Sequence, residues 1–373
     1  MAAKVMLAGI GYLGGDVLEF LARTPGIGKI TTVDNNEDYG TRKTNMAILG
    51  SALQGFYPEI EFIKCDISDS EKTAEIIKNI EPDLILNTTC LGSWWLLFEL
   101  PKELRERVDA DAGLGPFLPF HLALTYELMK AVKKANLSIP VLNSSFPDSV
   151  NPTLAKLGLA PTIGIGNIQQ QIPYIQKVVS ERLKVPRRNV SVFMVAHHSL
   201  NYTLWTYHET RGIPYFLKIL VNDRNVTNQF DLSELLSASS GIPRPRGKTH
   251  QQHTASCAVR LIRAMLFDTN ELVHCPGPNG LPGAYPVWLS AKGAQIVLPE
   301  ELSLEDAIRI NEEAQKFDGI ENIRNDGTVV FTDRAVRVMK DLFHMEYTEL
   351  RARDSMERAR ELSQILSERY LKK

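Results

Sequence analysis

The chain has 373 residues, of which 44% are hydrophobic and 23% charged, enough to bury a full core and to divide into two domains. Its formal net charge of −2 gives no reason to expect nucleic-acid or anionic-membrane binding. No apolar run reaches about 18 residues and no secretory signal pattern opens the chain, which predicts a soluble, cytoplasmic protein. The four cysteines lack zinc-site spacing and predict no disulfide framework: Cys65, Cys90, Cys257 and Cys275.

Residues 4–15 run from an apolar, strand-like segment through a glycine turn into a helical pattern that we expect to begin at Asp16. The spacing Gly9-x-Gly11-x-x-Gly14 suits a turn that brings a pyrophosphate close to the backbone. The helix that follows offers unpaired N–H groups and the positive end of its dipole. We therefore predict that a dinucleotide contacts Gly9, Gly11, Tyr12, Leu13 and Gly14.

Residues 29–34 indicate a second strand that ends in Asp34, at the usual distance after a dinucleotide-binding turn. Its carboxylate is placed to accept hydrogen bonds from the adenosine ribose, and it repels a 2′-phosphate. The cofactor predicted is therefore NAD rather than NADP. Arg42 and Lys43 lie slightly downstream, where they can soften that preference.

Further along, residues 59–64 favour a strand, 70–80 a helix and 83–89 a fourth strand. That strand ends in Asn87, Thr88 and Thr89, where open α/β sheets place their ligand crevice. We expect these three residues to contact the nicotinamide ribose or the substrate. Ordinary polar residues at a strand end are the alternative.

Residues 90–118 contain Trp94 and Trp95, a charged run and several glycines and prolines. They indicate a mobile insertion over the crevice, because long loops of this kind often act as lids. An oligomer contact is an equally good interpretation of the aromatic pair. Arg105 or Arg107 is a candidate contact for an anionic substrate, although exposed arginines are usually just solvated.

Residues 122–136 have helical periodicity and 139–143 form a fifth strand, ending in Asn143, another expected cofactor contact. A turn-rich stretch then follows to Pro152. We expect it to close a dinucleotide-binding domain of residues 1–152. Residues 153–343 would form the substrate domain and 344–373 a helical tail.

This order of elements, and the motifs after it, resemble the lactate/malate dehydrogenase superfamily, which includes the NAD-dependent family 4 glycosidases. The motifs are the turn 143–148, Gly164-Ile-Gly-Asn167 before a helix to Val185, residues 195–205 with two histidines and a tryptophan, 246–249, and 285–293 before 302–305. The resemblance implies an α/β protein with an N-terminal Rossmann domain, a doubly wound parallel sheet, and a C-terminal α+β domain. It also implies a homo-oligomer. Residues 66–87 are similar, too, to Rossmann domains of nucleotide-sugar epimerases.

The chemistry of an alcohol oxidation needs a group that takes or gives a proton, and histidine suits this because its pKa lies near physiological pH. His197 aligns best with the acid/base histidine of the superfamily, and a one-residue shift would replace it by His198. If both belong to a strand, their side chains point to opposite faces, which speaks against a metal held by the pair.

The departures from the superfamily pattern concern the substrate. The aspartate that orients the histidine and the arginine that clamps a carboxylate are both missing from the matching helix, where Gln169 to Gln171 and Tyr174 stand. A lactate or malate substrate is therefore not expected. A neutral, hydroxyl-rich or amide-containing substrate fits better, with contacts from Asn167, Gln170, Gln171, Tyr174 and Thr249. A polar helix face is the alternative for the glutamines.

No metal site is predicted, because the cysteine that holds the metal in family 4 glycosidases has no counterpart at residues 165–167. His250 and His253 share one helix face and line either the crevice or the surface. Residues 302–317 favour an amphipathic helix and 328–332 a strand. The tail from Tyr347 is expected to be a charged helix with an apolar stripe of Leu350, Leu362, Ile365, Leu366 and Tyr370.

The sequence thus predicts an NAD-dependent oxidoreductase that acts on a secondary alcohol or its carbonyl. One rival is a glycosidase or epimerase that uses NAD transiently, and another is a non-enzymatic nucleotide-binding protein. The partners expected are a small-molecule substrate and further copies of the chain, with neither nucleic acid nor membrane.

Overall fold

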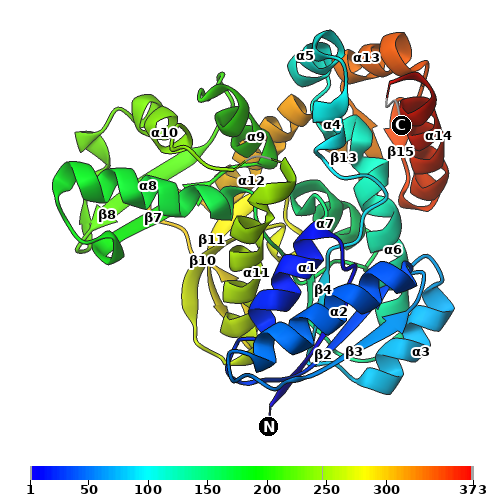
Figure 1. Ribbon diagram of the computed structural model, residues 1–373. Coiled ribbons are helices and arrows are strands. Elements are labelled where there is room, and N and C mark those ends of the chain that lie inside the picture. The colour runs from blue at the N-terminus through cyan, green and yellow to red at the C-terminus, as the bar shows by residue number, and fades with distance from the viewer. Residues whose placement is uncertain (1, 246, 371–373) are drawn as a thin grey trace.

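A computed structural model describes residues 2–245 and 247–370. A six-stranded parallel sheet, in the order β3-β2-β1-β4-β5-β6, forms the first half of the molecule (Figure 1). Its strands are β1 (Ala3–Ala8), β2 (Ile27–Asp34), β3 (Glu59–Lys64), β4 (Leu84–Asn87), β5 (Val141–Asn143) and β6 (Ile163–Gly164). Strand order reverses beside β1, so the predicted doubly wound sheet is confirmed.

The central strand β1 is apolar on both faces because helices cover both. Val5 and Leu7 pack in one cluster with residues of α1 (Tyr12–Leu21) and α11 (Gln251–Leu266). Met6 and Ala8 pack in another cluster, which includes α3 (Ser70–Ile80) and α6 (Leu118–Ala135). Alternate residues of a strand point to opposite faces, so this strand reads as one continuous apolar run. Burial on both sides fixes the sheet that carries the glycine turn.

Three expectations about the first half need correction. Helix α1 begins at Tyr12, not at Asp16, because Gly11 serves as its N-cap and Gly14 and Gly15 lie inside it. The segment after β4 is largely helical, with α4 (Leu96–Glu99), α5 (Lys102–Asp111) and η1 (Gly115–Phe117), rather than a long loop. The stretch after β5 is not only a turn, because α7 (Pro147–Ala155) begins there with proline in the first helical turn, where proline is tolerated.

The second half consists of helices and small antiparallel sheets. Its sheets are β7-β8-β9, β10-β11-β12 and β13-β14-β15. The strands are β7 (Val190–Val195), β8 (Phe216–Val221), β9 (Arg224–Asn225), β10 (Glu271–Pro276), β11 (Ala284–Ser290), β12 (Gly293–Ile296), β13 (Ile320–Ile323), β14 (Val329–Phe331) and β15 (Glu349–Leu350). The remaining helices are α2 (Glu37–Ala52), α8 (Ile168–Leu183), α9 (His198–Tyr207), α10 (Leu232–Ser240), α12 (Leu304–Gln315), α13 (Asp333–Phe343) and α14 (Ser355–Arg369), with short turns η4 (Gly247–His250) and η6 (Lys316–Asp318) among the others.

The C-terminal tail packs back on the first half. In Figure 1 the red helix α14 stands beside α13 and close to α6. Leu362 and Leu366 of its apolar stripe are buried in the same cluster as the α6 side chains. Leu350 belongs to β15 and not to the helix, which starts only at Ser355, so the predicted extent of the tail helix is wrong.

Two observations bear on the division of the chain and on membranes. β6 pairs with β5 although it follows residue 152, so the parallel sheet continues past the boundary expected from the sequence. The proposed domain limits stay a prediction. Among the described residues, no helix has the length and apolar character needed to cross a membrane.

Candidate functional site

A cleft of about 440 Å³ opens at the carboxyl ends of β1, β2 and β4, where open α/β sheets bind ligands. It is lined by many of the residues that the sequence singled out: Gly9, Gly11, Tyr12, Leu13, Asp34, Thr88, Thr89, Asn167 and Gln170. Its walls also include residues not predicted, notably His121, Ser144, Ser145 and Asp66. The sheet edge and the glycine turn thus share one hollow.

The three glycines of the turn have different tasks. Gly9 has a φ of +89°, in the region that favours glycine. A Cβ on Gly14 would stand 2.0 Å from the Gly9 carbonyl oxygen, so Gly14 permits the close contact of helix and turn. A Cβ on Gly11 would meet nothing within 4 Å. Gly11 therefore borders open space at the helix N-terminus, where a pyrophosphate needs room.

Asp34 stands at the end of β2 and is tied to the glycine turn. Its carboxylate accepts hydrogen bonds of 2.8 Å from the backbone N–H groups of Ile10 and Asn36. The two basic residues downstream are engaged elsewhere: Arg42 pairs with Asp38 at 2.9 Å, and Lys43 lies against Gly15 of α1. Asp34 thus brings a carboxylate to this rim of the cleft.

The polar residues at the ends of β4 and β5 divide into two groups. Thr88 and Thr89 line the cleft, and the Thr88 hydroxyl donates to the Gly9 carbonyl at 2.7 Å. Asn87 and Asn143 are fully buried outside the lining, and the Asn87 amide donates to Asn143 Oδ1 at 3.1 Å. These two asparagines hold the loops that form the cleft wall.

The two adjacent histidines follow β7, which ends at Val195. His197 is the N-cap of α9 and His198 its first residue. The expectation that they point to opposite faces of a strand is wrong, because both Nδ1 atoms face Asp318 Oδ2, at 3.3 Å from His197 and 2.8 Å from His198. The backbone turns from strand to helix between them, so the alternation of a strand does not apply.

Of the two histidines, only one can donate a hydrogen bond to Asp318 in this arrangement. The Ser199 backbone N–H donates to His197 Nδ1 at 3.3 Å, so that nitrogen acts as an acceptor. His198 Nδ1 therefore donates to Asp318. His198 also keeps 9% of its surface exposed, whereas His197 has none. Of the pair, His198 is therefore the better candidate for contact with a ligand, although neither ring is among the described residues that line the cleft.

The electrostatics of this group follow from burial and close charges. Burial alone would lower the pKa of His198, but the carboxylates of Asp318 and Asp148 outweigh it, and the pKa is raised above 6.5. Burial would raise the pKa of Asp318, but His198 and His197 hold it well below 3.8. The pair is thus a buried imidazolium and carboxylate.

Asp148 brings a second carboxyl group to the same place. It is fully buried, and burial raises its pKa despite the two histidines. One of its oxygens accepts a hydrogen bond from the Asn167 amide, and the other has no partner among the described residues. Asp148 thereby orients Asn167 at the cleft wall.

The remaining predicted substrate residues lie apart from one another. Gln170 lines the cleft and donates to Thr254 at 2.9 Å, but Gln171 points inward and donates to Asn201 at 2.8 Å. Tyr174 lies outside the lining, beside Trp205 and His253. Thr249 is exposed in η4, and Arg105 of α5 lies over the Phe98 ring at 5.5 Å.

His250 and His253 form a half-buried cluster rather than a free surface pair. Their ring centres are 5.3 Å apart, and His250 also packs on Trp205 at 4.9 Å. His250 Nε2 lies 3.3 Å from Gln170 Oε1, which connects the cluster to the cleft wall. Arg246, part of the motif before this helix, lies outside the described residues.

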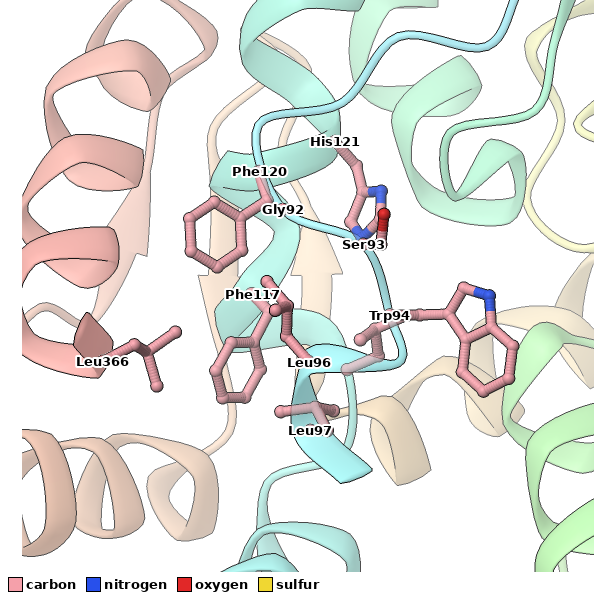
Figure 2. A pocket seen from close by; sticks show the side chains of 10 residues that line it. Gly92, Ser93, Trp94, Leu96, Leu97, Phe117, Phe120, His121 and Leu366 are labelled. Atoms are coloured by element: carbon pink, nitrogen blue, oxygen red, sulfur yellow. The ribbon is translucent and has the colours of Figure 1, made fainter. Parts of the chain in front are cut away.

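The segment after β4 covers part of the cleft with aromatic side chains. Trp94 and Trp95 line the cleft, and Trp95 meets Tyr12 edge-on at 5.9 Å. Beneath this segment is an apolar cavity of about 10 Å³, into which Phe117, Phe120 and Leu366 point (Figure 2). The cover is thus packed on the core, and its role as a lid stays a prediction.

The charge of the lining differs from that expected for an acid-binding site. The acidic residues among the described lining are Asp34 and Asp66, and no lysine or arginine is among the lining residues that the structure describes. Nor do three His, Cys, Asp or Glu side chains gather as metal ligands anywhere in residues 2–245 and 247–370.

Sequence reasoning missed Asp318 and His121 and undervalued Asp148. Asp318 stands in the short turn η6, 120 positions after His198, with no spacing that links them. His121 lies in the first turn of α6, where a single histidine in an apolar helix carries no signal. Asp148 did appear in the motif after β5, but only as part of a turn.

A scan of protein-family models finds no match, and no curated protein is similar in sequence. Solved structures are similar in fold. A lactate dehydrogenase from a Medee basin deep-sea metagenome library matches 84% of this chain and 96% of its own, with a TM-score of 0.59 at 14% identity. Malate dehydrogenase from Cryptosporidium parvum matches 85% and 98%, with a TM-score of 0.58 at 15% identity.

A third structure, malate dehydrogenase from Plasmodium falciparum in complex with NADH, covers 84% of this chain and 98% of its own, with a TM-score of 0.56 at 16% identity. The chain has the lactate/malate dehydrogenase fold. The predicted fold class and superfamily-level resemblance are therefore confirmed. In this chain the carboxylate beside the histidines is that of Asp318, in η6 and not in α8.

Proposed function

We propose that the protein is an NAD-dependent oxidoreductase that oxidises a secondary alcohol or reduces the matching carbonyl. The observation that carries the proposal is the cleft itself, which runs from the glycine turn and Asp34 to Asn167, the residue oriented by Asp148 beside the His198–Asp318 pair. The cleft would thus hold the cofactor, and its wall residue Asn167 is held by Asp148, a close neighbour of the proposed proton-transfer group. The fold shared with dehydrogenases agrees with this assignment.

The residues at the glycine turn fit a nicotinamide dinucleotide. The open space at Gly11 and the N-terminus of α1 would take the pyrophosphate, and Asp34 would accept hydrogen bonds from the adenosine ribose. When bound, the nicotinamide supplies hydride transfer. Because Asp34 repels a 2′-phosphate and Arg42 is paired with Asp38, we propose NAD over NADP.

His198 is the proposed acid/base residue. With Nδ1 donating to Asp318, the nitrogen left for the substrate oxygen is Nε2. The nearby carboxylates raise the pKa of His198 above the ordinary value for histidine, so the ring stays protonated to higher pH. A protonated ring suits protonation of a carbonyl oxygen. In the reverse direction the neutral ring would accept the hydroxyl proton at higher pH.

The proposed substrate is neutral and polar rather than a simple 2-hydroxy acid. A substrate carboxylate needs a cationic partner, and the described lining offers none. Asn167 and Gln170 instead present amide groups, each held by a partner, Asp148 for the first and Thr254 for the second. Amides of fixed orientation suit hydroxyl or amide groups on the ligand.

The test is calorimetry of NAD, NADH and NADP on the wild type and on two glycine variants. Gly11→Ala puts a methyl group into open space at the helix N-terminus, so it should still fold but lose NAD affinity at least tenfold. Gly15→Ala is the matched control, because its methyl would meet Lys43 at ordinary contact distance, away from the cleft. Equal affinity in both variants, or no binding by the wild type, would overturn the cofactor assignment.

Absorbance at 340 nm then separates the two NAD-using alternatives. A dehydrogenase accumulates NADH as product forms, whereas a glycosidase or epimerase releases product without net cofactor change. Growth of the 340 nm signal with a polyol or sugar alcohol is the result we expect. Product without that signal would favour transient oxidation.

A further inference from the structure

His121 forms part of the cleft wall, which neither His197 nor His198 does. It lies in the first turn of α6, and Leu124, one turn further on, lines the same cleft. Only 6% of His121 is exposed, and its Nδ1 has no hydrogen-bond partner among the described residues. A buried imidazole that lacks a hydrogen-bond partner is costly, so His121 has unused hydrogen-bonding capacity in the cleft wall.

The surroundings of His121 connect it with the proposed acid/base residue. The ring of Phe146 lies 6.0 Å from that of His121 and 4.8 Å from that of His198. Figure 2 shows His121 directed toward Ser93 of the aromatic cover, while its neighbour Phe120 points into the small apolar cavity. His121 is thus directed toward the cover, and it shares the neighbouring ring of Phe146 with His198.

The ring of His121 stays uncharged across the physiological range. Burial, aided by the charge of His198, lowers its pKa to about 3. A neutral imidazole donates one hydrogen bond and accepts one, which matches a hydroxyl group or a carbonyl with a nearby hydroxyl. A carboxylate ligand, by contrast, is bound better by a cationic side chain than by a neutral imidazole.

We propose that His121 binds a second oxygen of the substrate, beside the one that His198 serves, so that the substrate is a neutral polyol or hydroxyketone. The inference rests on the proposed function and adds the class of substrate. The neutral imidazole of His121 lies in the cleft wall, and both it and the charged imidazole of His198 pack beside the Phe146 ring, so each can serve a different oxygen atom of one ligand. A simple alcohol with one oxygen would leave His121 without a ligand partner.

The test uses the whole protein saturated with NADH and three sets of ligands: polyols and hydroxyketones, simple secondary alcohols and ketones, and 2-hydroxy acids. Binding is measured by thermal shift and calorimetry. We expect the first set to bind the wild type most tightly. His121→Phe, which keeps a ring but loses both hydrogen bonds, should weaken that binding about tenfold and leave NADH affinity within about twofold.

His121→Gln and Phe120→Leu serve as controls. Glutamine keeps a donor and an acceptor and should recover part of the affinity, whereas Phe120→Leu disturbs the same helix turn on its apolar side and should leave ligand binding unchanged. Failure of the first set to bind best, or equal ligand affinity in His121→Phe and wild type, would overturn the assignment. Failure of the wild type to bind NADH would instead overturn the proposed function.

Discussion

At the glycine-turn end, the cleft is formed mainly by one strand-helix-strand unit, residues 3–34, in which Gly9, Gly11 and Asp34 keep the spacing that the turn requires. At the histidine end, the groups come from α6, the start of α7, α8, α9 and η6, and meet only in the folded chain. The first end depends on local backbone geometry. The second depends on buried charges whose partners are distant in sequence, so the two ends should fail in different ways.

The largest effect is expected at the local end. Gly14→Ala places a methyl group 2.0 Å from the Gly9 carbonyl oxygen, so the helix and the turn must separate. We expect a loss of about 3 kcal/mol or more in the free energy of unfolding, measured by urea denaturation. Gly15→Ala, one residue on, should stabilise by about 0.5 kcal/mol through helix propensity. Similar stability for the two variants would contradict the described turn.

The next largest effect is expected at the distant end. Asp318→Asn removes the carboxylate to which His198 donates, and we expect it to destabilise the protein by about 2 kcal/mol near pH 5 to 6. Asp223→Asn, in the exposed turn between β8 and β9, is the matched control and should change little.

The pH dependence of the stability loss in Asp318→Asn follows from the pKa shifts of Asp318 and His198. The pKa of Asp318 in the fold lies below its ordinary 3.8, so its contribution appears above that value and disappears as the pH falls through the folded pKa. The pKa of His198 lies above 6.5, so its contribution is complete below 6.5 and disappears as the pH rises through the folded pKa. Unfolding curves across pH should therefore show the largest difference between wild type and Asp318→Asn from about 4 to 6.5. A difference that grows above pH 8 would contradict the pairing.

A smaller but more specific effect concerns the proton itself. In Asp318→Asn, burial is no longer outweighed by that carboxylate, so the pKa of His198 should fall from above 6.5 to below it. Histidine ¹⁵N shifts followed by titration measure this directly. Once a substrate is known, the pH above which the rate of carbonyl reduction falls should be lower in Asp318→Asn than in the wild type. An unchanged titration would mean that Asp318 is not the partner of His198.

The difference between the two ends also explains what the sequence could predict. The strand 59–64, the helix 70–80 and the glycine spacing depend on periodicity and local turns, so they could be predicted, and the strand and the helix have these limits in the structure. Helix α1 began earlier than expected because Gly14 and Gly15, ordinarily poor helix formers, lie inside it for close packing.

The histidine end could be predicted only in part. The residues 197 and 198 are recognisable from their neighbours, but their geometry depends on the strand ending at Val195. The partner in η6 has no signal in the sequence, because nothing but the folded chain relates residue 318 to residue 198. The absence of an aspartate from α8 therefore pointed away from a histidine–aspartate pair that the structure contains.

The smallest expected effect tests whether every buried carboxylate of this region contributes equally to the free energy of unfolding. Asp109 of α5 accepts hydrogen bonds from Tyr202 at 2.6 Å and Tyr207 at 3.3 Å, both on α9, so it joins the cover to the helix of His198. Burial raises the pKa of Asp109 even though the tyrosine hydroxyls lower it, which means that the site favours a neutral side chain. Asp109→Asn keeps an acceptor oxygen and should change the free energy of unfolding by less than about 1 kcal/mol, whereas Asp109→Leu should cost about 1–3 kcal/mol by leaving the hydroxyls unpaired. Urea denaturation at pH 7 measures both. If Asp109→Asn cost as much as Asp318→Asn, burial of a carboxylate rather than its pairing with His198 would set stability at this end of the cleft.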